Sequence, residues 1–164
     1  MASSVWDSLT CANLFVAFAA VTGFAEKKMG RLSMEYVFVV EVFWSDGRTS
    51  YIRRTYKDFL RFYKHLVSQF RSKDAPDNDV IPLPRLEGKR WYRRYTRGLA
   101  EYRELELHNF VKELLKASPE MASETIVIDF FEQRPTDPVP CPKEDKPFEV
   151  PNGRDHSQTQ LSAS

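Results

Sequence analysis

The sequence predicts an α+β fold in which a three-stranded antiparallel β-meander packs against a helical subdomain. Residues 35–44 alternate apolar side chains with the period of a strand, and the turn signal Ser45-Asp46-Gly47 follows directly. From about residue 57 the apolar spacing changes to that of a helix and stays helical. Hydrophobic residues make up 42% of the chain, enough to supply a core for one domain. Strand patterns that precede helical patterns are typical of the α+β class.

The strand patterns fall in three segments. Residues 14–24 form a strand rich in Val, Phe and Ala, and residues 26–31 are a charged connection. Residues 35–44 carry apolar side chains on both faces, which predicts a central strand covered on both sides. Gly47 completes a hairpin turn, and residues 49–56 form the returning strand. The apolar residues of the central strand are Tyr36, Phe38, Val40, Val42 and Trp44 on one face, and Val37, Val39 and Phe43 on the other.

Three helices are predicted after the sheet. The first has Phe59, Phe62, Tyr63, Leu66 and Phe70 at helical spacing, and the second has Leu99, Leu107, Phe110, Val111 and Leu114. Ser118-Pro119 ends the second helix, and residues 126–131 form a short last helix against the core.

Composition divides the chain into a flexible N-terminus (1–13), a folded domain (14–134) and a Pro-rich disordered tail (135–164). Cys11 and Cys141 are the two cysteines, so neither a disulfide framework nor a cysteine metal cluster is expected, which suits a reducing cytosol. The apolar run at residues 14–21 is too short to span a bilayer, so any membrane contact should be peripheral.

A basic segment stands out in a chain whose net charge is only +1. The residues from Arg85 to Arg103 include seven Lys/Arg and two Glu, which indicates an anionic partner. Lys89 follows a proline turn and Gly88, where its ammonium can reach a phosphate. The next residues alternate cations and amphipathic aromatics, as a bilayer interface prefers: Arg90, Trp91, Tyr92, Arg93 and Arg94. Nucleic-acid binding uses similar residues, and the other alternative is a solvated loop whose Trp91 packs inward.

Two further arginine positions are candidates for anion binding. Arg53 and Arg54 precede a helix N-terminus, a combination that suits phosphate, although two solvated arginines on an edge strand would look the same. Arg103 falls in the middle of the apolar stripe of the second helix, so its guanidinium needs an anion or several hydrogen-bond acceptors. The partner is either Glu106, one helical turn away, or a ligand anion between this helix and the sheet.

Catalysis is not predicted. The chain has three histidines and contains no nucleophile elbow, glycine-rich phosphate loop or metal-ligand spacing. We therefore expect no enzymatic activity, no catalytic residue, no metal and no cofactor.

Taken together, the motifs resemble the phox-homology (PX) domain over about residues 14–138. They are Trp44-Ser45-Asp46-Gly47, Arg53-Arg54-Thr55-Tyr56-Lys57-Asp58-Phe59, Ile81-Pro82, Arg103 with Leu107, Phe110 and Leu114, and Asp129-Phe130-Phe131 with Arg134-Pro135. Within that family the first two motifs, together with Thr96-Arg97-Gly98-Leu99-Ala100, are most similar to NADPH oxidase organizer proteins. These proteins normally continue into SH3 domains.

The resemblance implies a phosphoinositide pocket between the sheet and the helices. It implies that an arginine at Arg53-Arg54 binds a ring phosphate and that Tyr56 lies against the inositol ring. It also implies that Lys89 meets the phosphate linked to glycerol and that Arg103 bonds ring hydroxyls or a further phosphate. Trp91 and Tyr92 would lie in or near a membrane-inserting loop.

The sequence departs from the family pattern at two places. Counting back from Phe59 puts Thr55 where the phosphate-binding arginine usually stands, so either Arg54 reaches the site through a bulge or lipid preference differs. The segment Pro82-Leu83-Pro84-Arg85 lacks the second proline of the family's Pro-x-x-Pro, which weighs against SH3 docking there.

The function expected from the sequence is that of a phosphoinositide-binding module, cytoplasmic and peripheral on the plasma or endosomal membrane, in an oxidase-organizing protein. Its expected partners are phosphoinositides and anionic membrane surfaces, with oxidase subunits or SH3 domains as further partners. A protein-interaction adaptor and a sorting-nexin-like trafficking protein are the alternatives, and a nucleic-acid partner is not expected.

Overall fold

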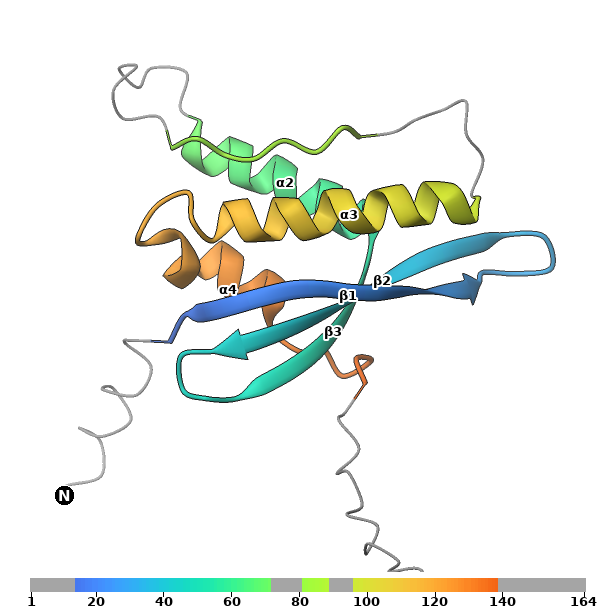
Figure 1. Cartoon of the computed structure of the whole chain (residues 1–164), viewed down its shortest axis with the longest axis horizontal. Helices are drawn as coiled ribbons and strands as arrows, with labels where there is room; N and C mark the ends of the chain where they lie inside the picture. The colour runs from blue at the N-terminus through green and yellow to red at the C-terminus, as the bar shows by residue number, and fades with distance from the viewer. Residues whose placement is uncertain (1–13, 72–80, 89–95, 139–164) are drawn as a thin grey trace, which may run out of the picture.

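A computed structural model of the chain describes residues 14–71, 81–88 and 96–138. Three strands come first: β1 (Val16–Lys28), β2 (Met34–Trp44) and β3 (Thr49–Thr55). They are followed by α2 (Tyr56–Phe70), α3 (Arg97–Leu114), the 3-10 turn η1 (Met121–Ser123) and α4 (Thr125–Phe131). In Figure 1 the three helices lie on one side of the sheet. The predicted α+β fold is confirmed.

The sheet is an antiparallel meander with strand order β1-β2-β3, so β2 is the central strand as predicted. β1 is longer than expected, because the predicted charged connection continues the ladder as far as Lys28, which is opposite Met34. The charged side chains are compatible with strand pairing there: Lys27 is opposite Glu35, and the Tyr36 hydroxyl donates to Glu26 over 3.4 Å. The predicted connection therefore shrinks to a short turn.

The hairpin between β2 and β3 forms where the turn signal lies. Gly47 has a φ of 87°, a left-handed conformation that favours glycine. The Asp46 carboxylate accepts the backbone N–H of Arg48 over 3.0 Å and closes the turn. The returning strand ends at Thr55, one residue earlier than predicted, because Tyr56 begins α2.

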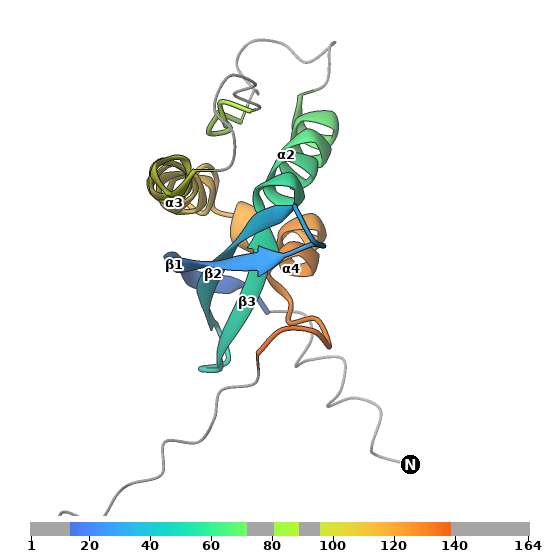
Figure 2. The ribbon, with the colours of Figure 1, turned by 90° about the vertical axis from the view of Figure 1, so that its right-hand side faces the viewer.

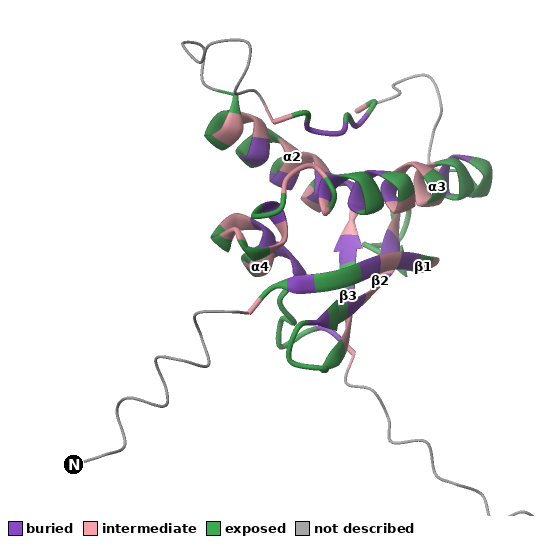
Figure 3. Cartoon of the chain, turned by 60° about the vertical axis from the view of Figure 1, so that its left-hand side comes forward, coloured by how far each residue is buried: buried purple, intermediate pink, exposed green. Residues whose placement is uncertain are grey.

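The two faces of β2 differ in burial, which corrects the prediction that both are covered. Phe38, Val40 and Val42 are fully buried on the face toward the helices. On the opposite face Phe43 is 36% exposed, and its ring lies 5.8 Å from that of the exposed Phe18. Helices cover only one face of this sheet (Figure 3), so Phe18 and Phe43 on the other face remain exposed.

An aromatic cluster joins α2, α3 and α4. Phe59, Phe62 and Leu66 form the buried stripe of α2, as predicted. Phe62 stacks on Phe130 with ring centroids 4.0 Å apart, and Phe59 meets Phe110 edge to face. The predicted stripe of α3 is also buried, and α4 contributes Val127, Phe130 and Phe131.

The folded domain extends beyond its predicted end at Arg134. Asp137 is only 6% exposed, and its carboxylate accepts the backbone N–H groups of Arg53 and Arg134. The first residues of the predicted tail therefore belong to the fold. The rest of that tail, residues 139–164, and the predicted N-terminal segment 1–13 lie outside the described residues.

No helix in the described part of the chain is long and apolar enough to cross a membrane.

Candidate phosphate-binding site beside Tyr56 and Arg103

The junction between β3 and α2 is fixed by a capping box. The Thr55 hydroxyl accepts the backbone N–H of Asp58 over 3.2 Å, and the Asp58 carboxylate accepts the backbone N–H of Thr55 over 2.9 Å. The spacing Thr-x-x-Asp is a sequence signature of this cap, so this role of Thr55 was readable from the sequence. The cap holds Tyr56, the first residue of α2, in a defined orientation.

Arg54 lies inside the protein and serves the fold. Its side chain is fully buried, and its guanidinium donates to the Asp137 carboxylate over 2.8 Å and to the carbonyls of Phe130 and Glu132. Burial lowers the pKa of Arg54, and the nearby Asp137 carboxylate opposes this shift. This placement corrects the expectation that Arg54 meets a ligand phosphate, because its donors are already used and no ligand can reach it.

Arg53 is exposed, but on the other face of the sheet. Side chains alternate along β3, and both neighbours of Arg53, namely Ile52 and Arg54, point into the core. Arg53 pairs with Val39 on the uncovered side of β2. The structure therefore does not bring Arg53 together with Tyr56 and Arg103, which corrects the prediction that these residues share one site.

Tyr56 is the centre of the remaining cluster. The residue is only 6% exposed, its hydroxyl donates to Glu106 Oε2 over 2.9 Å, and the same hydroxyl accepts the backbone N–H of Gly88 over 3.2 Å. Burial, followed by the charge and the hydrogen bond of Glu106, raises the pKa of Tyr56. The hydroxyl therefore stays protonated and links α2, α3 and the segment before Lys89.

Arg103 lies over the face of Tyr56. Its guanidinium carbon is 4.0 Å from the ring centroid, and the side chain is half-buried between Leu99 and Leu107, one turn away on either side. The predicted placement of this arginine in the apolar stripe of the second helix is thus confirmed. A guanidinium that lies over an aromatic ring can still donate its N–H groups to an anion.

Glu106 has other partners than Arg103. Its Oε1 accepts the backbone N–H of Glu87 over 2.6 Å, while Oε2 accepts from Tyr56. No ion pair joins Arg103 to a carboxylate within the described residues. Of the two alternatives for Arg103, the geometry favours a ligand anion over the intrahelical pair. The sequence alone gave no signal for this use of Glu106, since it depends on a contact with a distant segment.

The proline segment, residues 81–88, ends beside this site, and the basic loop, residues 89–97, follows it in the sequence. Leu83, Pro84 and Leu86 are buried, and the Tyr102 hydroxyl donates to Glu87, so the segment is held against α3. Gly88, at a φ of 83°, ends it beside Tyr56. Lys89 comes next, but it lies outside the described residues, as do the predicted membrane contacts Arg90, Trp91, Tyr92, Arg93 and Arg94. Their roles remain predictions.

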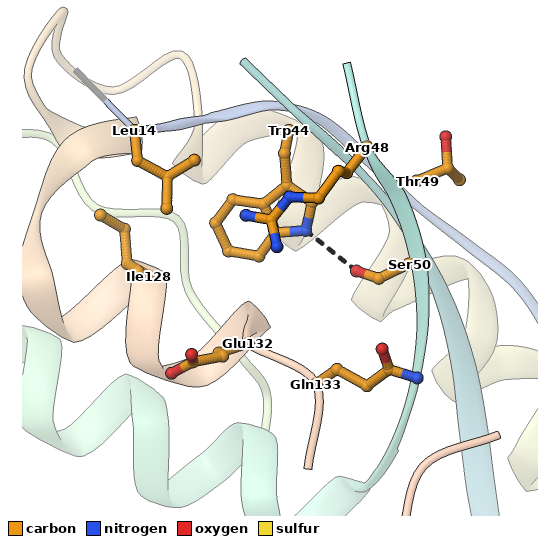
Figure 4. A pocket seen from close by; sticks show the side chains of 8 residues that line it. All are labelled: Leu14, Trp44, Arg48, Thr49, Ser50, Ile128, Glu132 and Gln133. Carbon is orange, nitrogen blue, oxygen red and sulfur yellow. Dashed lines mark hydrogen bonds between the residues drawn. The ribbon is translucent and has the colours of Figure 1, made fainter. Parts of the chain in front are cut away.

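A cavity lies away from this site, between the β2–β3 hairpin and α4 (Figure 4). It has a volume of about 380 Å³ and contains none of the predicted site residues. Trp44 closes one side and donates from its indole N–H to the Ser50 hydroxyl over 2.9 Å. Arg48 and Glu132 give it one charge of each sign, so it offers no concentrated positive field for an anion.

Comparison with known proteins identifies the class. The PX domain family matches residues 43–134, more than half of the chain, and the chain belongs to this family. Membership implies phosphoinositide-binding membrane targeting, and PX domains are non-enzymatic lipid-binding modules.

The similar proteins are named for both SH3 and PX domains. Mouse SH3 and PX domain-containing protein 2B is 32% identical over 124 residues, which are 73% of this chain and 13% of that protein. Human SH3 and PX domain-containing protein 2A is 34% identical over 117 residues, 69% of this chain and 10% of that protein. The chain thus spans a small part of these relatives. Their names do not support the narrower resemblance to oxidase organizers.

A solved structure agrees with the fold. The X-ray structure of a designed CISK-PX domain is 20% identical, with a TM-score of 0.56 over 69% of this chain and 96% of that one. At this identity the likeness concerns the fold alone.

Proposed function

We propose that this chain binds a phosphoinositide headgroup beside Tyr56 and Arg103 and thereby brings its protein to a membrane. The observation that carries the proposal is the Arg103 guanidinium, half-buried on the Tyr56 ring without an ion pair from the described residues. A buried cation costs free energy unless an anion meets it. A phosphate or the hydroxyls of an inositol ring would provide the missing acceptors.

The basic loop would supply the remaining contacts. Gly88 is anchored on Tyr56, so Lys89 starts from the edge of the site and its ammonium can meet the phosphate that links to glycerol. In this proposal Arg90, Arg93 and Arg94 meet anionic lipid, while Trp91 and Tyr92 enter the headgroup zone. In this proposal no arginine of β3 contributes, because Arg54 is buried against Asp137 and Arg53 lies on the other face of the sheet. Thr55, which follows them, caps α2. A lipid preference different from that of arginine-containing relatives follows.

The wider context we propose is an oxidase organizer, on the resemblance of several motifs to NADPH oxidase organizer 1. The support is the motif set Trp44-Ser45-Asp46-Gly47, Arg53-Arg54-Thr55-Tyr56 and Thr96-Arg97-Gly98-Leu99-Ala100. In that role the module would act from the cytoplasm on the plasma or endosomal membrane and support assembly of a superoxide-generating oxidase. Superoxide output of oxidase-expressing cells, with the chain intact or carrying Arg103→Gln, tests this context.

Docking of an SH3 domain on the proline segment finds less support. Pro82 is exposed, but Leu83 and Pro84 are buried against the helical subdomain. A proline ligand must present both its prolines to an aromatic groove, and this segment presents only one.

The proposed headgroup site is tested by Arg103→Gln. A charge-assisted hydrogen bond in a partly buried site contributes about 1.5–3 kcal/mol, so affinity for soluble inositol phosphates should fall roughly tenfold or more. The protein should still fold, because glutamine removes the half-buried cation and leaves no unpaired charge behind. Arg61→Gln is the matched control, since Arg61 is an exposed arginine on α2 and its loss changes the net charge equally.

Calorimetry with a panel of soluble inositol phosphates and thermal unfolding on the same samples separate the outcomes. The proposal predicts weaker binding for Arg103→Gln alone and unfolding temperatures close to that of the parent. A destabilised Arg103→Gln protein with intact affinity would assign Arg103 to the fold and overturn the site.

A further inference from the structure

The cavity between the β2–β3 hairpin and α4 has no part in the proposed headgroup site. Its walls come from the residue before β1, from the hairpin and from the end of α4 (Figure 4), and its volume is about 380 Å³. Ligand pockets of proteins have volumes of about 300–1,000 Å³. The cavity is therefore large enough to hold one long side chain of a partner.

Hydrogen bonds hold the walls of this cavity in place. The backbone N–H of Phe15 donates to the Ser45 hydroxyl over 3.0 Å, and the N–H of Ser45 donates to the Phe15 carbonyl over 2.9 Å. These two bonds keep the neighbouring Leu14 beside the hairpin. At the opposite wall, the Glu132 carbonyl accepts from the buried guanidinium of Arg54 over 2.7 Å. The cavity is therefore preformed, as ligand sites usually are.

One side of the cavity is apolar. Leu14 and Ile128 line it, and both are half-buried against the core. Trp44 lies next to them in Figure 4, is only 6% exposed, and already uses its indole N–H on the Ser50 hydroxyl over 2.9 Å. This side therefore suits the methylene stem of a long side chain.

The charges around the cavity favour a cation. Asp46 neutralises Arg48, because its carboxylate accepts from the Nε of Arg48 over 2.6 Å and from the backbone N–H over 3.0 Å. No ion pair or hydrogen bond reaches the Glu132 carboxylate from the described residues. In addition, residues 117–133 contain four carboxylates and neither Lys nor Arg. The field on the α4 side of the cavity is therefore negative.

A second acceptor follows Glu132 in the cavity wall. Gln133 donates from Nε2 to the Pro138 carbonyl over 3.0 Å, which leaves its amide oxygen as an acceptor. An ammonium or a guanidinium carries several N–H donors and so needs more than one acceptor when it binds. Lys and Arg side chains combine such a cationic head with an apolar stem. Their shape and charge therefore match this cavity.

We propose that this cavity binds a Lys or Arg side chain from a basic peptide of a partner protein. The stem lies along Leu14 and Ile128, and the cationic head meets the Glu132 carboxylate and the Gln133 amide oxygen. The exposed hairpin residue Thr49 forms part of the rim, where the peptide backbone can pass. The chain thereby gains a protein-binding role that does not depend on the headgroup site.

The cavity and the headgroup site lie in different parts of the molecule. No residue of α2 or α3 lines the cavity, whereas the headgroup site is built on Tyr56 of α2 and Arg103 of α3. Figure 1 shows the β2–β3 hairpin and α4 on the left and the N-terminal half of α3, which carries Arg103, on the right. Figure 2 also shows α4 apart from this half of α3. A lipid headgroup and a basic peptide can therefore be bound at the same time.

The chemical class of the ligand is tested by NMR titration of the isotope-labelled chain with capped tripeptides. The probes are Ala-Lys-Ala, Ala-Arg-Ala, Ala-Glu-Ala and a peptide with norleucine at the centre, which keeps an apolar stem without a charge. The indole N–H resonance of Trp44 is the readout, because this group lies in the cavity wall. The Lys and Arg peptides should shift it, the norleucine peptide should bind about tenfold more weakly, and the Glu peptide should leave it unchanged.

Variants of the cavity wall test the assigned contacts. Glu132→Gln should weaken the Lys and Arg peptides about tenfold and leave the norleucine peptide unaffected. Glu120→Gln is the matched control, since Glu120 is an exposed carboxylate of the same acidic segment outside the cavity, and it should bind as the parent does. Leu14→Ala should weaken the Lys and norleucine peptides alike, because the stem loses its packing. Thermal unfolding confirms that each variant is folded.

Three results would overturn the proposal. The first is an unshifted Trp44 indole resonance at millimolar concentrations of both cationic peptides. The second is equal weakening by Glu132→Gln and Glu120→Gln, which would show a general effect of negative charge. The third is binding of the Glu peptide that is lost in Arg48→Gln, which would show that the cavity takes an anion.

The variant Arg103→Gln separates this inference from the headgroup site. It should bind the Lys and Arg peptides as tightly as the parent does, because Arg103 does not line the cavity. Loss of peptide binding in this variant would place the peptide at the headgroup site and overturn the inference. If the parent fails to bind soluble inositol phosphates, the headgroup proposal fails, and the peptide titrations still decide on the cavity.

Discussion

At the scale of single residues, two adjacent arginines on β3 lie on opposite faces of the sheet, because side chains alternate along a strand. Arg54 points inward and pairs with Asp137, while Arg53 points to the uncovered face. A fully buried ion pair is costly to form and more costly to break, since removal of one partner leaves an uncompensated charge. Hydrogen bonds from the Arg54 guanidinium to Asp137 and to several carbonyls offset the cost of burying this charge.

We predict that Asp137→Ala destabilises the protein by about 3–5 kcal/mol, the range for breaking a buried pair. Glu101→Ala is the control, because its pair with Arg97 is exposed and should contribute no more than about 1 kcal/mol. Urea unfolding measures both. The double variant Arg54→Met/Asp137→Leu should recover much of the loss, and a small effect of Asp137→Ala would argue against the buried pair.

The same pair predicts a pH dependence. Although burial raises the pKa of Asp137, the N–H group of Arg134 and the guanidinium of Arg54 outweigh it and hold the pKa below the usual range. A carboxyl whose pKa is lower in the folded state stabilises the protein above its unfolded pKa of about 3.9, and this contribution is lost as pH falls through the folded value. The stability difference between the parent and Asp137→Ala should therefore shrink on acidification below about pH 4.

At the scale of elements, α2 owes its starting point to Thr55. The reciprocal bonds between Thr55 and Asp58 satisfy donors that the first turn of a helix leaves unpaired. Asp58 also places a negative charge in the first turn, which the helix dipole favours. This cap gives Thr55 a role in the fold, because the residue stabilises the start of the helix.

We predict that Thr55→Ala lowers the free energy of unfolding by about 1 kcal/mol, the usual cost of losing an N-cap. Thr55→Ser keeps the hydroxyl and should remain close to the parent. Affinity for soluble inositol phosphates should be unchanged in both variants, as measured by calorimetry. A marked loss of affinity in a stably folded Thr55→Ala protein would instead place Thr55 in the ligand site.

At the scale of the whole molecule, a contact between distant parts of the sequence closes the fold. Asp137 bonds to the backbone of Arg53 on β3, 84 residues earlier, and so joins the end of the domain to the sheet. The same carboxylate accepts from Arg134 and shapes the turn after α4. The fold therefore extends past the last helix at least as far as Asp137.

We predict that a chain ending after Arg134 is far less stable than one ending after Pro138. The shorter chain lacks Asp137 and leaves the buried Arg54 guanidinium without its counter-ion. Thermal unfolding followed by circular dichroism compares the two chains. Equal unfolding temperatures would show that residues 135–138 add nothing to the fold and would restore the boundary predicted from composition.

The sequence by itself determined the sheet, the helices and the position of Arg103 in its apolar stripe. These features depend on local periodicity and turn chemistry, as at Gly47 and along Phe59, Phe62 and Leu66, and such signals lie within a few residues of one another. The basic composition of residues 85–97 likewise predicted an anionic partner without any structure. The extension of β1 was missed because charged residues pair across an exposed hairpin as readily as apolar ones do.

Only the tertiary structure decided which charged residues are available to a ligand. Sequence reasoning grouped Arg53, Arg54 and Arg103 by charge. The fold buries Arg54 against Asp137, turns Arg53 outward and leaves Arg103 on Tyr56. Arg54 is occupied by Asp137, which lies 83 residues away in the sequence. Glu106 is occupied by the backbone of Glu87, 19 residues away. Charge is a property of one residue, but burial and pairing depend on side chains that only folding brings together.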